Sequence, residues 1–154
     1  SLVQYVSACY SGSMFYDKEL PPNAYVATAA PVLASGYAIV YDWLRHTYLA
    51  SSFPFAAIKS MDDSLQMTFQ AHFVYINSQL TNLSLPCQYG DLSITEQAIS
   101  DFFEVSGSAT PKMRRANSLE ESMKDAVPQY DVPFEIAKRR HAAQPSAQAA
   151  AQLE

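Results

Sequence analysis

Short apolar runs at three places along the chain predict β-strands. Residues 2–8, 24–29 and 37–41 are rich in Val, Tyr, Ala and Ile, and turn-forming residues follow the first and precede the third. Runs of this length without strict polar alternation are typical of strands that are buried on both faces. We therefore expect three strands in the first third of the chain.

Helical spacing of apolar residues begins in the middle of the chain. Residues 63–79 predict a helix, and Asp62 and Asp63 are placed to complement its first-turn amides. The apolar positions of this helix are Leu65, Phe69, Phe73 and Ile76. Residues 95–103 predict a shorter helix that begins at a threonine. Strands followed by helices indicate a layered α/β arrangement.

The composition of the chain changes after residue 105. Residues 106–130 begin with a Ser, Gly and Pro segment followed by basic residues, which predicts a linker after a packed domain of residues 1–105. Residues 131–154 form a tail in which Pro133 is typical of the first turn of a helix. The final residues 144–154 are rich in Ala and Gln, and we expect them to be frayed.

Composition and charge exclude several classes of function. The net charge of −5 and the pI near 5.1 argue against a nucleic-acid partner, which requires clustered Lys and Arg. No apolar stretch approaches the roughly 20 residues of a membrane-spanning helix. The two cysteines, Cys9 and Cys87, lack metal-ligand spacing, so no metal or other cofactor is predicted.

Cys9 is the candidate nucleophile. It follows the first predicted strand and precedes Tyr10-Ser11-Gly12-Ser13, whose small residues would let a peptide carbonyl approach closely. The backbone N–H of Cys9 could then point at the developing oxyanion. The alternative is that Cys9 is a buried small hydrophobic residue, which is the usual role of a free cysteine.

Residues 5–15 resemble the nucleophile segment of the legumain (asparaginyl endopeptidase) family. The family pattern is an apolar strand, Glu-Ala-Cys and then Ser-Gly-Ser-Met, and this chain has Ser7-Ala8-Cys9 followed by Ser-Gly-Ser-Met at residues 11–14. Further segments resemble the family in the same order, namely residues 25–30, 35–38, 41–42, 47–49, 88–91, 131–134 and 138–140. The resemblance therefore covers most of the chain.

The resemblance implies an α/β fold, the carboxyl-terminal half of a caspase-like (hemoglobinase) three-layer sandwich. It implies hydrolysis of a protein or peptide substrate by Cys9 and a histidine. That histidine belongs to the amino-terminal half of the domain, which is an expected partner and is not in this sequence. His46, His72 and His141 do not match its position, and we expect ordinary surface or core roles for them.

The substrate pocket departs from the family pattern. Pocket positions of the family correspond to Ser7, Ser35 and Ser51, and serines stand at Ser7 and Ser51 where the family has acids. A preference for Asn or Asp before the scissile bond is therefore uncertain, and the pocket could accept other small polar residues.

The resemblance also suggests processing and location. The tail from residue 131 is expected to begin a propeptide that covers the cleft. Its removal is expected to use an upstream residue such as Asn117 or Asp125, or another protease that cuts near Arg139-Arg140 on an exposed segment. An acidic endolysosomal or vacuolar compartment, or secretion, is implied, and Asn82 is a glycosylation candidate. Cys87 is expected to be a quiet thiol.

Two other functions stay open. The glycosylphosphatidylinositol transamidase catalytic subunit has a related fold and dyad. A catalytically inactive homologue that serves as a binding module is motivated by the lost acids at Ser7 and Ser51.

Overall fold

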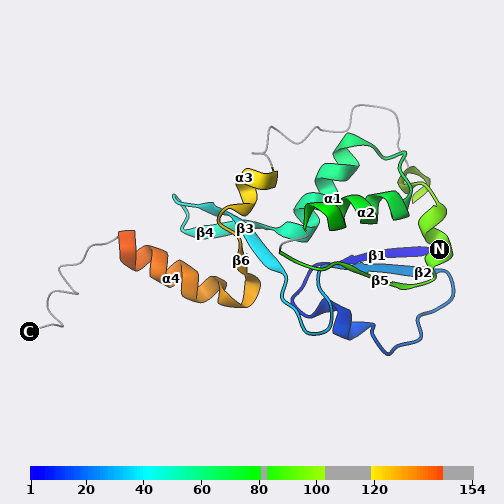
Figure 1. Ribbon diagram of the computed structural model, residues 1–154, viewed down its shortest axis with the longest axis horizontal. Helices are drawn as coiled ribbons and strands as arrows, with labels where there is room; N and C mark the ends of the chain where they lie inside the picture. The colour runs from blue at the N-terminus through cyan, green and yellow to red at the C-terminus, as the bar shows by residue number, and fades with distance from the viewer. Residues whose placement is uncertain (81–82, 103–118, 144–154) are drawn as a thin grey trace, which may run out of the picture.

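The computed structural model describes residues 1–80, 83–102 and 119–143 (Figure 1). Asn82, Asn117, the start of the predicted linker at residues 106–111 and the final residues 144–154 lie outside the described residues. The strands are β1 (Leu2–Val6), β2 (Ala24–Thr28), β3 (Tyr37–Asp42), β4 (Thr47–Ser51), β5 (Cys87–Gly90) and β6 (Val127–Pro128). The α-helices are α1 (Ser52–Asp63), α2 (Phe69–Gln79), α3 (Leu119–Met123) and α4 (Val132–Ala143). The short 3-10 helices are η1 (Ser11–Met14), η2 (Leu92–Glu96), η3 (Ile99–Phe102) and η4 (Gln129–Asp131).

The first sheet has the order β1-β2-β5. β1 runs parallel to β2, with Leu2 opposite Ala24, and β5 runs antiparallel to β2, with Thr28 opposite Cys87. All five residues of β2 are buried, as expected for a central strand of small and β-branched residues. Helices α1 and α2 lie on one face of this sheet, and the segment that contains η1 lies on the other (Figure 1).

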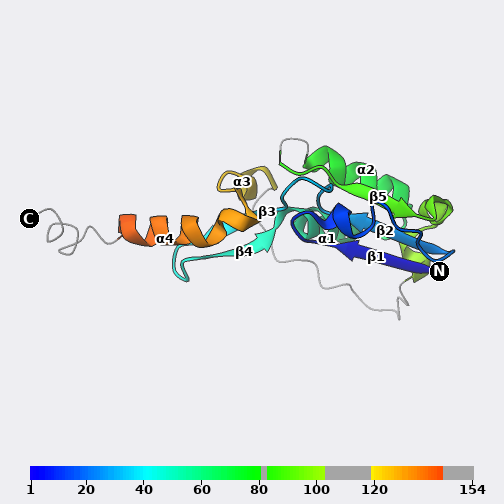
Figure 2. The ribbon, with the colours of Figure 1, turned by 90° about the horizontal axis from the view of Figure 1, so that it is seen from below.

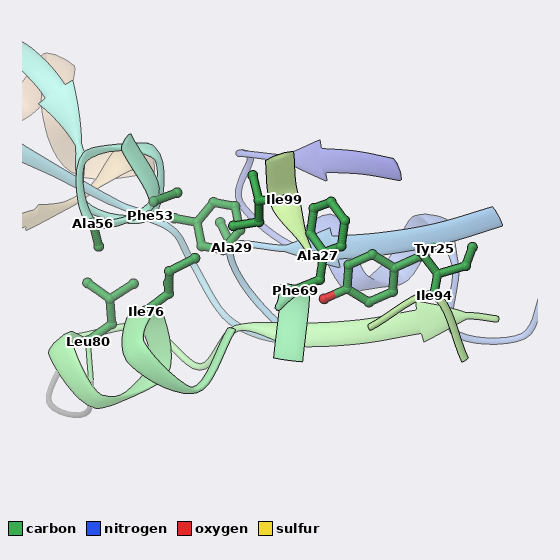
Figure 3. Close-up of a cluster of buried hydrophobic side chains, with 11 residues drawn as sticks. Tyr25, Ala27, Ala29, Phe53, Ala56, Phe69, Ile76, Leu80, Ile94 and Ile99 are labelled. Atoms are coloured by element: carbon green, nitrogen blue, oxygen red, sulfur yellow. The ribbon is translucent and has the colours of Figure 1, made fainter. Parts of the chain in front are cut away.

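The core lies between the first sheet and its helices. Tyr25 and Ala27 of β2 pack against Phe53 of α1 and against Phe69 and Ile76 of α2 (Figure 3). Each of these side chains is at most 2% exposed, so the burial of their apolar surface is the main stabilising term for this layer pair.

The second sheet has the order β4-β3-β6 and is antiparallel throughout. β6 pairs with the first residues of β3, with Tyr37 opposite Pro128 and Ala38 opposite Val127. Helix α4 follows β6 and extends away from the first sheet alongside β3 and β4 (Figures 1 and 2).

The predicted strands at residues 2–8, 24–29 and 37–41 are confirmed as β1, β2 and β3, and the helix predicted from residue 131 is confirmed as α4. The helix predicted over residues 63–79 is confirmed only in part, since α2 covers its residues 69–79. Asp63 is the last residue of α1, and α2 begins only at Phe69, where Thr68 Oγ1 caps the backbone N–H of Ala71 at 3.1 Å.

The break between α1 and α2 has a tertiary cause. The carbonyls of Leu65 and Met67 accept hydrogen bonds from the backbone N–H groups of Ser100 and Ile99, at 2.8 and 3.0 Å. In an α-helix these carbonyls would accept hydrogen bonds from the same helix. Because they accept from Ser100 and Ile99 instead, the segment is not helical. The helix predicted at residues 95–103 is wrong, since the described part of that range contains the end of the 3-10 helix η2 and the separate 3-10 helix η3.

Part of the predicted linker has regular structure. Within residues 106–130, the described residues 119–128 contain α3 and β6, and β6 pairs with β3. A β-ladder joins this stretch to the second sheet. Because the start of the predicted linker lies outside the described residues, the boundary after residue 105 stays a prediction.

Candidate active site

Cys9 lies on a sharp turn at the carboxyl end of β1. Tyr10, the next residue, has a left-handed backbone with φ of 56°, and its N–H donates to the carbonyl of Ala34 at 2.8 Å. A non-glycine residue in this region is uncommon and is held there by its surroundings. The turn directs the chain from the strand into η1.

Ser11 and Gly12 fix this turn to the end of β2. The buried hydroxyl of Ser11 donates to the carbonyl of Ala30 at 3.3 Å and accepts from the N–H of Ala30 at 3.1 Å. Gly12 donates its N–H to the same carbonyl at 2.8 Å, and a Cβ on Gly12 would stand 2.6 Å from the hydroxyl of Tyr89. Close packing therefore requires the glycine at residue 12, and the two hydrogen bonds to Ala30 explain the serine at residue 11.

The Cys9 thiol contacts two side chains. Its Sγ lies 3.1 Å from Ser35 Oγ and 3.6 Å from Gln129 Oε1. Ser35 donates its own proton to the carbonyl of Gly36 at 2.7 Å. The thiol is therefore the donor in this cluster, and its proton goes to Ser35 Oγ or to Gln129 Oε1.

Gln129 joins Cys9 to Ser51. Its Nε2 donates to Ser51 Oγ at 2.6 Å, while its backbone N–H donates to the carbonyl of Gly36 at 2.9 Å. Ser51 ends β4 opposite Ala38 of β3, and Gln129 directly follows β6 on the other edge of β3. The glutamine side chain therefore crosses the amino-terminal end of β3.

The sequence-predicted pocket residues divide into two groups. Ser35 contacts Cys9 directly, and Ser51 is linked to it through Gln129. Ser7 is exposed, and no hydrogen bond joins it to Cys9 or Gln129 in the described part of the chain. Sequence reasoning missed Gln129, although its position just before the propeptide-like segment at residue 131 was a signal.

An apolar groove adjoins this cluster. It has a volume of about 530 Å³ and reaches from Ser51 and Gln129 between β4, α1 and the start of α4. Its apolar lining includes Tyr48, Leu49, Pro54, Phe55, Ile58 and Val132. Apolar clefts with a few convergent polar groups are typical of ligand-binding sites.

The three histidines lie apart from the cluster. His72 is fully buried between Tyr5 Oη at 2.8 Å and the Ala57 carbonyl at 3.1 Å, His46 lies in the turn between β3 and β4, and His141 is exposed on α4. Within the described residues, none of them hydrogen-bonds to Cys9. Their placement agrees with the surface and core roles expected for them.

Tyr130 and Asp131 supply the local electrostatics. The carboxylate of Asp131 raises the pKa of the Tyr130 phenol, with smaller contributions from burial and from Tyr10, Tyr37 and Cys9. Across the described ranges, no group of three or more His, Cys, Asp and Glu side chains gathers as a metal site would require. None of the helices in those ranges is long and apolar enough to cross a membrane.

Comparison with known proteins identifies the family of the chain. The model of the peptidase C13 family matches residues 1–125. This chain belongs to the peptidase C13 family. Bovine legumain is 32% identical over 143 residues, which cover 90% of this chain and 32% of the relative.

Other relatives align in the same way. Human legumain is 31% identical over 143 residues, covering 90% of this chain and 32% of the relative, and the hemoglobinase of Schistosoma japonicum is 32% identical over 144 residues, covering 90% and 33%. The chain thus spans about a third of the length of these relatives. The mixed α/β architecture is consistent with part of the caspase-like legumain fold, as expected from the sequence.

Proposed function

We propose that this chain is the carboxyl-terminal half of the catalytic domain of a legumain-like cysteine endopeptidase, with Cys9 as the nucleophile. The observation that carries the proposal is the position of the Cys9 thiol on the turn after β1, beside the Ser35 hydroxyl and the Gln129 carboxamide. Membership of a peptidase family supports a protein or peptide substrate.

The reaction requires a base from the amino-terminal half of the domain. In the proposed mechanism a histidine of that half takes the Sγ–H proton, and the Cys9 thiolate attacks the peptide carbonyl carbon. The backbone N–H of Cys9 stabilises the oxyanion, and the protonated histidine returns its proton to the departing amine. Water then hydrolyses the thioester and releases the free Cys9.

Gln129 holds the site in a resting state in this proposal. Its Oε1 accepts from the neutral thiol, whereas a thiolate would face the same oxygen lone pairs without a proton between them. The segment that carries Gln129 leads into α4, so we propose that it belongs to a propeptide that is displaced before substrate binds. An acidic endolysosomal or vacuolar compartment, or secretion, is proposed by analogy with the family.

A catalytically inactive homologue that acts as a binding module is the second candidate. The exchange of family acids for Ser7 and Ser51 motivates it. Covalent labelling separates the two candidates, because a binding module has no need of an activated thiol. We propose the peptidase because Cys9 is partly accessible and its neighbours are polar.

The test uses the longer protein that includes the upstream part of the domain. An electrophilic peptide probe should label the wild-type protein after removal of the propeptide, and Cys9→Ala should abolish the labelling. Cys87→Ala is a matched control, since Cys87 is the other free cysteine and its Sγ contacts the Leu85 carbonyl at 3.5 Å and the Tyr89 side chain rather than Ser35 or Gln129. Labelling that survives in Cys9→Ala would refute the nucleophile assignment, and no labelling of the wild type would favour the binding module.

A further inference from the structure

The side-chain amide of Gln129 lies next to the candidate nucleophile, between the uncharged side chains of Ser51 and Cys9. Its Nε2 is bound by Ser51 Oγ at 2.6 Å, and its Oε1 faces the Cys9 thiol at 3.6 Å. Both ends of the amide thus have a hydrogen-bond partner. A half-buried amide with its donor and its acceptor both satisfied is in a site that suits it.

Gly36 shapes the wall of this site. A Cβ on Gly36 would approach Gln129 Oε1 to 3.0 Å and Gln129 Cδ to 3.4 Å, which is tighter than most such contacts. The absence of a side chain at Gly36 therefore leaves the space that the carboxamide fills. Gly36 also accepts the backbone N–H of Gln129 at 2.9 Å, so one residue fixes both the main chain and the side chain of the occupant.

The distance between the Gly36 carbonyl and Ser51 Oγ determines how long the amide side chain between them must be. The main chain is fixed at Gly36, and the carboxamide must reach across β3 to Ser51 Oγ at the end of β4. Asparagine is shorter by one C–C bond, roughly 1.5 Å, so the same contact would open from 2.6 Å to roughly 4 Å and would no longer be a hydrogen bond. An amide donor buried without its acceptor loses that bond and remains desolvated.

We propose that the Ser35–Ser51 pocket takes a glutamine side chain of the substrate, with Ser51 as the residue that determines specificity. The proposal rests on the proposed peptidase function, and it names the substrate residue whose amide takes over the hydrogen bond of Gln129 Nε2 to Ser51 Oγ once the segment leaves. Ser51 accepts the amide N–H of that residue. Because a hydroxyl is neutral across the pH range, recognition by Ser51 itself does not titrate, whereas an aspartate at this position would titrate near pH 4.

The first experiment measures kcat/KM for peptides that differ only in the residue before the scissile bond. The enzyme is the longer protein after removal of its propeptide, and the residues compared are Gln, Asn and Ala. We expect Gln to exceed Asn by about tenfold, and Ser51→Ala to lower the Gln value by about 3- to 10-fold, the effect of one neutral hydrogen bond, while the Ala value stays unchanged. Ser64→Ala is the control, since Ser64 Oγ contacts the Gln66 backbone at the end of α1 and should leave all three values unchanged.

A second variant tests the same proposal if Ser51→Ala fails to fold. Ser51→Asp retains an acceptor, and the ratio of kcat/KM for Gln to that for Ala should then depend on pH as the new carboxyl group titrates. If the kcat/KM for Asn equalled that for Gln, the glutamine proposal would be overturned. Labelling of Cys9 in the same protein would still support the proposed function. No cleavage of any peptide together with no labelling of Cys9 would overturn both.

The unprocessed precursor offers an independent measurement. In Gln129→Asn the shortened side chain should lose its bond to Ser51, so labelling of Cys9 by a small electrophile should become about 3- to 10-fold faster. Gln66→Asn, which makes the same shortening at an exposed residue between α1 and α2, should label at the wild-type rate. Equal rates for wild type and Gln129→Asn would overturn the length argument.

Discussion

At the scale of single residues, His72 shows how a histidine can be structural rather than catalytic. Its side chain is 0% exposed, its Nε2 lies 3.1 Å from the Ala57 carbonyl, and its Nδ1 lies 2.8 Å from Tyr5 Oη. A carbonyl can only accept, so Nε2 carries the proton and Nδ1 accepts from the tyrosine. Both ring nitrogens are satisfied in the neutral form, and His72 therefore links β1, α1 and α2.

This arrangement predicts a pH dependence of stability. Burial lowers the pKa of His72 below its ordinary value of 6.5, against a smaller opposing effect of the Ala57 carbonyl. The unfolded chain therefore binds a proton more readily than the folded chain below about pH 6.5. The stabilising contribution of His72 is fully present above that pH, and it is lost as the pH falls through the folded pKa.

The measurement is the urea midpoint of unfolding between pH 5 and pH 8. For His72→Gln, which can make the same two hydrogen bonds without titrating, the midpoint should fall less steeply on acidification than for the wild type. His141→Gln changes an exposed histidine on α4 and should follow the wild-type curve. Parallel curves for the wild type and His72→Gln would contradict the prediction.

At the scale of elements, one arginine attaches α4 to the β3–β4 hairpin. The Arg139 guanidinium lies 4.4 Å from the centre of the Tyr41 ring and within 5.6 Å of the centres of the Trp43 and Tyr48 rings. It also pairs with Glu135 at 2.8 Å and with Asp125 at 3.2 Å. Its side chain is 14% exposed, so the expectation of an exposed cutting site at Arg139-Arg140 is not met while α4 is folded.

We predict that Arg139→Ala loosens α4. Loss of the contacts with the aromatic rings should cost about 1 kcal/mol, and the local opening of the helix should increase about fivefold. Hydrogen exchange of residues 132–143 measures this change directly. Arg140→Ala is the matched control, because Arg140 is exposed on the same helix and its removal should leave the exchange unchanged. Equal protection in both variants would show that other contacts hold α4.

At the scale of the whole molecule, β1 is an edge strand of the first sheet, and one of its two sides has no partner strand among the described residues. β1 pairs with β2 alone among the described strands, and Leu2 at its start is 58% exposed. A pocket of about 370 Å³ beside this edge is lined by Leu2, Val3, Tyr5, Met61, Phe69 and Phe102. An open edge with apolar side chains next to it is a place where further strands can pair.

We predict that residues 1–154 alone have no peptidase activity and bind a hydrophobic dye strongly. The longer protein that includes the upstream half should bind less dye, because we expect that half to pair with β1 and to cover the pocket. Fluorescence of the dye and turnover of a peptide substrate test both parts of the prediction. Leu2→Lys in the short chain should reduce the dye signal, whereas Leu44→Lys, at an exposed leucine of the β3–β4 turn, should reduce it less. Normal turnover by residues 1–154 would contradict the need for an upstream base.

The sequence by itself determined the features that depend on neighbouring residues. The apolar runs predicted β1, β2 and β3, because a buried strand needs only a short stretch of suitable side chains. The helix that begins near Asp131 was predicted from Pro133 in its first turn. The Cys9 turn was singled out because small residues follow an apolar strand, and the family followed from motifs in a fixed order.

Only the tertiary structure decided the features that depend on distant partners. Residues 64–68 are kept from joining α2 by hydrogen bonds to Ile99 and Ser100, which no local pattern announces. β6 is two residues long and exists only because β3 offers it an edge. The same pairing brings Gln129 to Cys9 and Ser51 across separations of 120 and 78 residues. Hydrogen-bond partners this far apart are chosen by sheet register, and the register is fixed only when the whole core is packed.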